Sequence, residues 1–203
     1  MSQITPGDHI VVVRRNYVTN IETPRVIGYD VSFLDLRFKF GFQPDLAFIE
    51  SCITTKTKMV SITCPHDPTG TLISREALDE LVAITNRNNC LLLVDETYRD
   101  VSYCRQLPVA ASLGDHILSV SSLSKSSGVP GIQLGWAVTQ NKKLQEIFLD
   151  ARAQISISGS VIDEWIASHL LGNKENTLYL TIKEIETRVD IVRSWIEKKD
   201  RLE

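Results

Sequence analysis

The sequence lacks the features that bring a protein to a membrane or to nucleic acid. No apolar run approaches the ~20 residues that cross a bilayer, and the start, MSQITPGDH, has neither the basic nor the apolar region of a secretory signal. The 22 basic and 25 acidic residues give a formal net charge of -3 and are interspersed, so no basic stripe is present. We therefore expect a cytoplasmic protein without a membrane or nucleic-acid partner.

Cysteine is also scarce, and its spacing excludes the common metal motifs. Cys52, Cys64, Cys90 and Cys104 are scattered without a CxxC pair. This pattern favours buried free thiols over a disulfide or a zinc site. We predict no metal site and assign the thiols no chemistry.

Apolar strand-like runs alternate with helical segments, which predicts an α/β fold. With 203 residues, 43% of them hydrophobic, the chain can build a substantial core. The predicted strands are His9–Val13, Thr57–Thr63, Cys90–Val94, His116–Val120 and Ile132–Val138. Cys90–Val94 is apolar at every position, which is typical of a parallel strand covered by helices on both faces.

Helical patterns follow. One helix is expected to begin at Ser74, a good N-cap residue, and to end near Asn88. From Asn141 onward the pattern is helical, with a helix over Val161–Leu171. The last helix carries a regular seam of apolar residues, at Leu178, Ile182, Ile185, Val189, Val192 and Ile196. The seam predicts packing along a domain or a partner rather than a free coiled coil.

Polar clusters follow three of the predicted strands. They are Cys64-Pro-His-Asp-Pro-Thr-Gly70, Val94-Asp-Glu-Thr-Tyr98 and Ser121-Ser-Leu-Ser-Lys-Ser-Ser-Gly-Val-Pro-Gly131. In open α/β sheets, ligands bind outside the carboxyl ends of the strands. Taken singly, each cluster also has a structural interpretation, since Asp67 could start a turn, Asp95 could cap a segment and Lys125 could be a loop lysine.

Together the clusters resemble one family. The order of an N-P-T-G-like turn, a strand ending in D-x-x-Y and the segment SLSKSSGVPGIQLGW is similar to aminotransferase class I/II, of the fold type I pyridoxal-phosphate enzymes. The resemblance implies a mostly parallel, seven-stranded-type sheet sandwiched by helices. It assigns residues 1–173 to the large cofactor-binding domain, lacking the family's N-terminal part, and 174–203 to a long helix leading into a small domain.

The resemblance also implies roles. Lys125 would hold pyridoxal 5'-phosphate as a Schiff base and then move a proton at the substrate Cα, because a lysine amine can do both. Asp95 would keep the pyridine nitrogen protonated, since a sheltered carboxylate stabilises that charge. Tyr98 would donate a hydrogen bond to the phenolate oxygen of the cofactor.

Other expected contacts include two departures from the family pattern. Ser122 and Ser124 would lie around the phosphate, and Tyr17 would stack on the ring. Asp67 stands where the family has an asparagine donor, and an ionised carboxylate cannot donate. Gln133 stands where the family has an arginine on the phosphate, so this contact brings no charge and weaker cofactor retention is expected.

The resemblance implies an amino-acid aminotransferase that passes an amino group from an amino acid to a 2-oxo acid. A C–S lyase, a decarboxylase, or a non-catalytic, truncated or decayed subunit of the same fold are the alternatives. Regulators that fuse this fold to a DNA-binding domain are less favoured, because nothing resembles a basic helix-turn-helix. A homodimer or a complementing chain is expected, with little activity from this chain alone.

Overall fold

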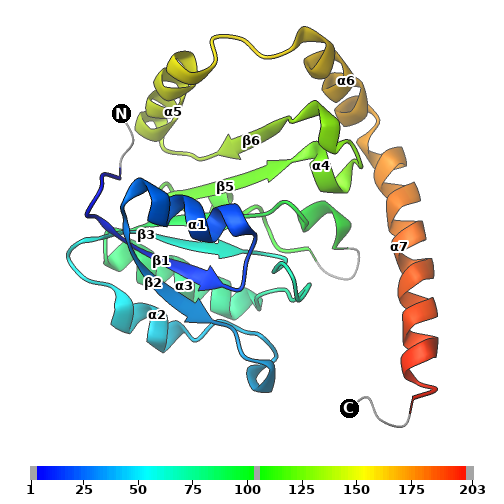
Figure 1. The fold of residues 1–203 in the computed structure, drawn as a ribbon, viewed down its shortest axis with the longest axis horizontal. Helices are drawn as coiled ribbons and strands as arrows, with labels where there is room; N and C mark the ends of the chain where they lie inside the picture. Colours follow the sequence, from blue (N-terminus) through cyan, green and yellow to red (C-terminus); the bar gives the residue numbers. More distant parts are fainter. Residues whose placement is uncertain (1–3, 103–105, 200–203) are drawn as a thin grey trace.

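The computed structural model describes residues 4–102 and 106–199, which form a six-stranded sheet flanked by helices (Figure 1). The strand order is β2-β1-β3-β4-β5-β6. Every neighbouring pair is parallel except β5 and β6, which run antiparallel. The predicted fold class, a mostly parallel sheet sandwiched by helices, is confirmed, with six strands in the described residues where the resemblance implied a seven-stranded type.

The five predicted strands are present, and a sixth was not predicted. The strands are β1 (His9–Arg14), β2 (Asp30–Asp35), β3 (Thr57–Thr63), β4 (Leu91–Asp95), β5 (Ile117–Ser122) and β6 (Gly135–Val138). β6 begins at Gly135 rather than at Ile132, because Pro130–Ile132 form a 3₁₀ turn. β2 is the strand that the sequence pattern did not indicate.

The helices are α1 (Val18–Ile27), α2 (Leu46–Cys52), α3 (Arg75–Arg87), α4 (Leu123–Ser126), α5 (Lys142–Ile155), α6 (Val161–Gly172) and α7 (Lys174–Ile196). α3 begins where predicted, because the Ser74 side chain accepts a hydrogen bond from the Ala77 backbone N–H at 3.1 Å. Asn141 caps α5 in the same way through Leu144, at 3.2 Å.

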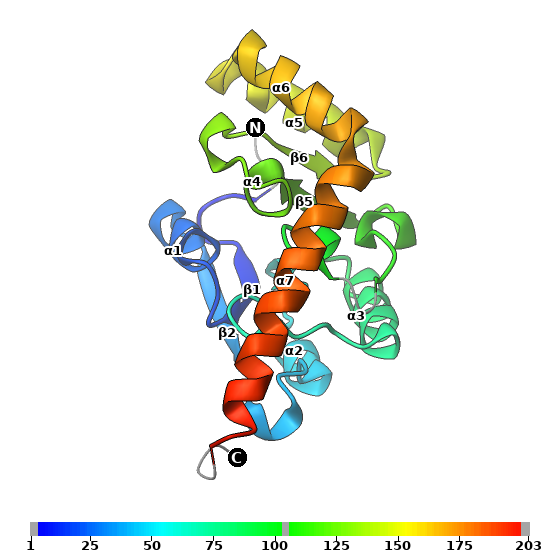
Figure 2. The ribbon, with the colours of Figure 1, turned by 90° about the vertical axis from the view of Figure 1, so that its right-hand side faces the viewer.

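The two faces of the sheet are covered unequally. α2 and α3 lie on one face and α1 on the other (Figure 2). The main core lies on the α2 and α3 side, where Ile49, Leu81 and Leu92 are fully buried. On the opposite face Leu91 and Leu93 are only half-buried. The apolar run Cys90–Val94 is therefore fully covered on one face only, which corrects the expectation that helices cover it on both faces.

α7 runs beside the sheet with no buried residue along its 23 positions (Figures 1 and 2). α7 contacts the 3₁₀ turn Arg99–Val101, where a salt bridge of 2.9 Å joins Lys174, the first residue of the helix, to Asp100. The predicted seam is half-buried through Val189 and becomes exposed at Val192 and Ile196. The boundary after residue 173 stays a prediction.

Three cysteines lie within the described residues and are free thiols. Cys64 and Cys90 are buried and Cys52 is half-buried, and burial raises the pKa of the Cys64 and Cys90 thiols. Cys104 lies outside the described residues. Within residues 4–102 and 106–199, no helix combines the length and apolar character that spanning a bilayer requires.

Candidate active site

A cavity of about 380 Å³ lies at the carboxyl ends of β1, β3, β4 and β5. All eight residues singled out from the sequence line this cavity. They are Tyr17, Asp67, Asp95, Tyr98, Ser122, Ser124, Lys125 and Gln133. The parallel strands explain the convergence, because their carboxyl ends meet at one edge of the sheet although the segments are far apart in sequence.

Lys125 lies in the four-residue helix α4, directly after β5. Ser122, at the end of β5, is extended and its hydroxyl accepts a hydrogen bond from the Ser124 N–H at 3.4 Å, which starts the turn. Gly128 has a φ of 68°, a left-handed conformation that favours glycine, and its N–H donates to the Lys125 carbonyl at 3.2 Å. The Lys125 side chain is exposed at the cavity wall.

The carboxylate of Asp95 is held by three hydrogen bonds. One oxygen accepts from the backbone N–H and the hydroxyl of Thr97, at 3.0 and 2.6 Å. The other accepts from the side-chain amide of Asn20 at 3.1 Å. Asp95 therefore caps the segment after β4 and also faces the cavity, so both interpretations of this residue hold.

Two asparagines that sequence reasoning missed surround Tyr17. The Asn16 side-chain oxygen accepts from Thr63 Oγ1 at 3.0 Å and from Asn20 Nδ2 at 3.3 Å. Asn16 lines the cavity, and its amide nitrogen is buried without a partner within the described residues. Asn16 precedes the N-cap of α1 and Asn20 lies in its first turn, so their contact depends on how the chain enters the helix, and no sequence motif indicated it.

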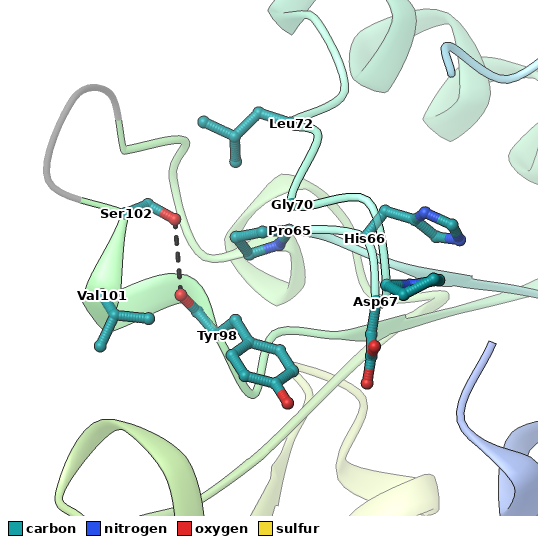
Figure 3. A pocket seen from close by; sticks show the side chains of 9 residues that line it. Pro65, His66, Asp67, Gly70, Leu72, Tyr98, Val101 and Ser102 are labelled. Carbon is teal, nitrogen blue, oxygen red and sulfur yellow. Dashed lines mark hydrogen bonds between the residues drawn. The ribbon is translucent and has the colours of Figure 1, made fainter. Parts of the chain in front are cut away.

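Asp67 and Tyr98 come from separate loops and point in the same direction (Figure 3). They also border a second hollow of about 450 Å³, whose other walls include Pro65, Leu72 and Val101. The two hollows therefore adjoin at Asp67 and Tyr98, and the second one offers mostly apolar side chains.

Gln133 lines the cavity but bonds within its own turn. It has a φ of 50°, and its side-chain amide donates to the Pro130 carbonyl at 2.8 Å. The side-chain amide of Gln133, which stands where the resemblance places an arginine, thus donates one hydrogen bond to the backbone. It brings no positive charge to the cavity.

His66, adjacent to Asp67, does not line the cavity. It is buried, with Nε2 donating to the Arg15 carbonyl at 2.9 Å and Nδ1 lying 2.8 Å from Thr69 Oγ1. Burial lowers the pKa of His66, which favours the neutral ring. Its contacts support the 66–69 turn.

An exposed lysine amine and a fixed carboxylate face one cavity at the carboxyl edge of the α/β sheet, with hydroxyls between them. This arrangement brings an amine, a carboxylate and hydroxyl groups together in one cavity of an α/β domain.

The chain belongs to the aminotransferase class I and II family, whose sequence pattern matches residues 1–198. Aspartate aminotransferase of Thermotoga maritima is 28% identical over 145 residues, covering 70% of this chain and 38% of the relative. Alanine aminotransferase of Mycobacterium tuberculosis is 35% identical over 149 residues, covering 71% of this chain and 34% of the relative. The chain thus spans well under two thirds of these relatives.

Solved structures agree in fold. A PLP-dependent aminotransferase of Streptococcus suis superposes with a TM-score of 0.91 at 30% identity, covering 97% of this chain and 52% of that one. Aspartate aminotransferase of Thermus thermophilus, solved with maleate, gives a TM-score of 0.88 at 23% identity, covering 94% and 51%. The second likeness concerns the fold alone.

Proposed function

We propose that this chain forms the cofactor-binding part of a pyridoxal-phosphate-dependent aminotransferase, which passes an amino group from an amino acid to a 2-oxo acid. The observation that carries the proposal is the convergence of Lys125, Asp95 and Tyr98 on one cavity, in a chain of the aminotransferase class I and II family. Residues 1–173 would be the large domain and 174–203 a helix leading out of it.

The residues of the cavity fit pyridoxal 5'-phosphate. Asp95 would hold the ring nitrogen, because each carboxylate oxygen has two lone pairs and Oδ2 receives a single hydrogen bond, from Asn20, within the described residues. Ser122 and Ser124 would donate to the phosphate. Tyr17, 59% exposed at the N-cap of α1, would lie on the ring face.

When bound, the cofactor supplies an aldehyde carbon that takes up the amino group and a ring that withdraws electrons. Lys125 would bind that carbon and, once released by the substrate amine, would move the proton at the substrate Cα. Tyr98 would donate to the ring oxygen, while Asn20 and Thr97 keep Asp95 in place. The adjoining apolar hollow at Leu72 and Val101 extends the site beyond the Lys125 cavity.

The test is a measurement of the product. The chain loaded with pyridoxal phosphate is mixed with a panel of amino acids, and the 2-oxo acid released is quantified by mass spectrometry. We expect about one equivalent of 2-oxo acid per chain from at least one amino acid, and none from Lys125→Ala. Release of carbon dioxide or of a thiol instead would favour a decarboxylase or a C–S lyase.

A non-catalytic subunit is the second candidate, favoured by the uncharged Gln133. It predicts cofactor binding without any release of 2-oxo acid in the same assay. We also propose a cytoplasmic location and assembly as a homodimer or with a complementing chain. Large apolar side chains at the surface of α5 to α7 support the assembly, among them Ile155 and Trp165, which are 86% and 62% exposed.

Gln133→Arg should tighten the binding of pyridoxal phosphate. A guanidinium at this position would add a charge-assisted hydrogen bond to the phosphate, worth roughly 1.5–3 kcal/mol, or about 10- to 150-fold in Kd. Titration followed by the absorbance of the bound cofactor measures the change. Gln133→Met, which keeps the length but loses the amide, is the control, and equal affinities for all three proteins would show that position 133 does not face the phosphate.

A further inference from the structure

A larger pocket, of about 630 Å³, opens on the other side of the 66–69 turn, beyond the ends of β1 and β2. Its lining includes Arg14, Arg15, Asp35, Arg37, Phe38 and Phe42. It shares no lining residue with the Lys125 cavity. The hydrogen bond from His66 to the Arg15 carbonyl joins the two segments that separate the cavities.

The arginine pocket, as we name it by Arg14, Arg15 and Arg37, is positively charged. Three arginines face one carboxylate, Asp35, which leaves a local charge of +2 in a chain whose net charge is -3. The hydrogen bonds and charge of Arg14, with Arg15 and Arg37 adding to the field, lower the pKa of Asp35, so that Asp35 stays ionised. The three arginines and this carboxylate line the same pocket.

The three arginines differ in whether their guanidinium groups have a partner within the described residues. Arg14 makes a two-pronged contact with Asp35, at 2.9 and 2.6 Å. In residues 4–102 and 106–199, the guanidinium groups of Arg15 and Arg37 have no ion pair or hydrogen bond. Two free guanidinium groups beside one neutralised pair are suited to a ligand that carries two negative charges.

An aromatic wall accompanies the charge. Phe38 and Phe42 pack edge to face, with ring centroids 5.7 Å apart and an angle of 69° between the rings. Phe38 is 77% exposed, so one face of its ring has no cover from the protein. A large exposed aromatic ring next to arginines offers a stacking surface to a planar group.

We propose that the arginine pocket binds a phosphate monoester attached to a planar ring, with the phosphate on Arg15 and Arg37 and the ring against Phe38. The phosphate supplies the double charge, and the exposed phenyl face supplies the ring contact. Mononucleotides and phosphorylated pyridines share this chemistry. The proposal does not depend on the aminotransferase reaction, because it uses none of the residues of the Lys125 cavity.

The experiment measures binding to the whole chain by calorimetry, with the Lys125 cavity first blocked by pyridoxal phosphate that is fixed to the chain by borohydride reduction, and with the excess removed. AMP and pyridoxine 5'-phosphate are the two probes, and the tighter one identifies the source of the ligand. Arg15→Gln and Arg37→Gln should each weaken binding of that probe by about tenfold or more. Phe38→Leu should weaken it while leaving inorganic phosphate unchanged.

Arg152→Gln is the matched control for the loss of one charge. Arg152 is exposed on α5, at the opposite end of the molecule (Figures 1 and 2). It should change the affinity less than about twofold, and thermal unfolding should confirm that all variants are folded. Absence of binding by both probes, or equal losses in Arg152→Gln and Arg15→Gln, would each overturn the proposal.

Discussion

Lys125→Ala is expected to abolish the covalent attachment of pyridoxal phosphate to this chain. The reason is geometric, because Lys125 lies in the cavity that also holds the Asp95 carboxylate and the serine hydroxyls. Borohydride reduction of the loaded chain, followed by peptide mass mapping, should place the label on the peptide that contains Lys125. The variant should lose this label completely.

Lys142→Ala is the matched control. Lys142 is exposed at the start of α5, as Lys125 is exposed in α4, so accessibility to the reagent is comparable. It should retain full labelling at Lys125. Label spread over surface lysines, or retained in Lys125→Ala, would contradict the assignment.

Asp95→Asn should weaken the binding of pyridoxal phosphate by at least about 30-fold, because removing one partner of a sheltered charge pair costs about 2 kcal/mol or more. The variant would lose the negative charge that we propose to lie opposite the ring nitrogen of the bound cofactor. It would also bring an amide N–H group against Asn20, which now donates to Asp95. Titration followed by the absorbance of the cofactor measures the combined effect of the lost charge and the disturbed hydrogen bond to Asn20.

The double variant Asn20→Asp with Asp95→Asn separates these effects. It restores a donor and an acceptor between the two side chains and keeps the total charge, but it moves the charge to position 20. Weak binding in both variants would show that the charge is needed at position 95. Recovery of wild-type affinity in the double variant would instead assign the loss to the broken hydrogen bond.

The sequence was most informative where the chemistry is local. Ser74 predicted the start of α3, because a cap acts within three residues. The parallel-sheet rule then explains why Asp95 and Lys125, 30 positions apart in the chain, face one cavity. Motif and topology together therefore placed all eight residues named from the sequence at one cavity, but they did not indicate Asn16 or Asn20.

Other helices and strands were not predicted because their sequence patterns are weak or misleading. α1 contains Pro24, which ordinarily ends a helical pattern, and none of its residues is buried. β2 carries an aspartate at each end, and its apolar residues Val31, Phe33 and Leu34 do not alternate regularly with polar ones, so the strand pattern is weak. α2 is only seven residues long, too short for a clear period.

Contacts between residues far apart in the sequence could not be predicted from sequence motifs. The amide of Asn20 reaches Asp95 across 75 positions. Arg14, Arg15 and Arg37 form a positive pocket, although interspersed acidic residues hide it in the sequence. Leu91 and Leu93 are only half-buried because of where the helices pack on the sheet. The composition of β4 does not predict that packing.

Because α7 is a regular helix without a buried residue, its helical structure does not by itself protect its backbone amides from exchange with solvent. The amide protons of α3 lie over Leu81 and Ile84, both buried, and can reach solvent only when the core itself opens. Those of α7 lie on a helix without a buried residue, so local opening suffices. Hydrogen exchange should therefore be slow in α3 and fast in the outer helix α7.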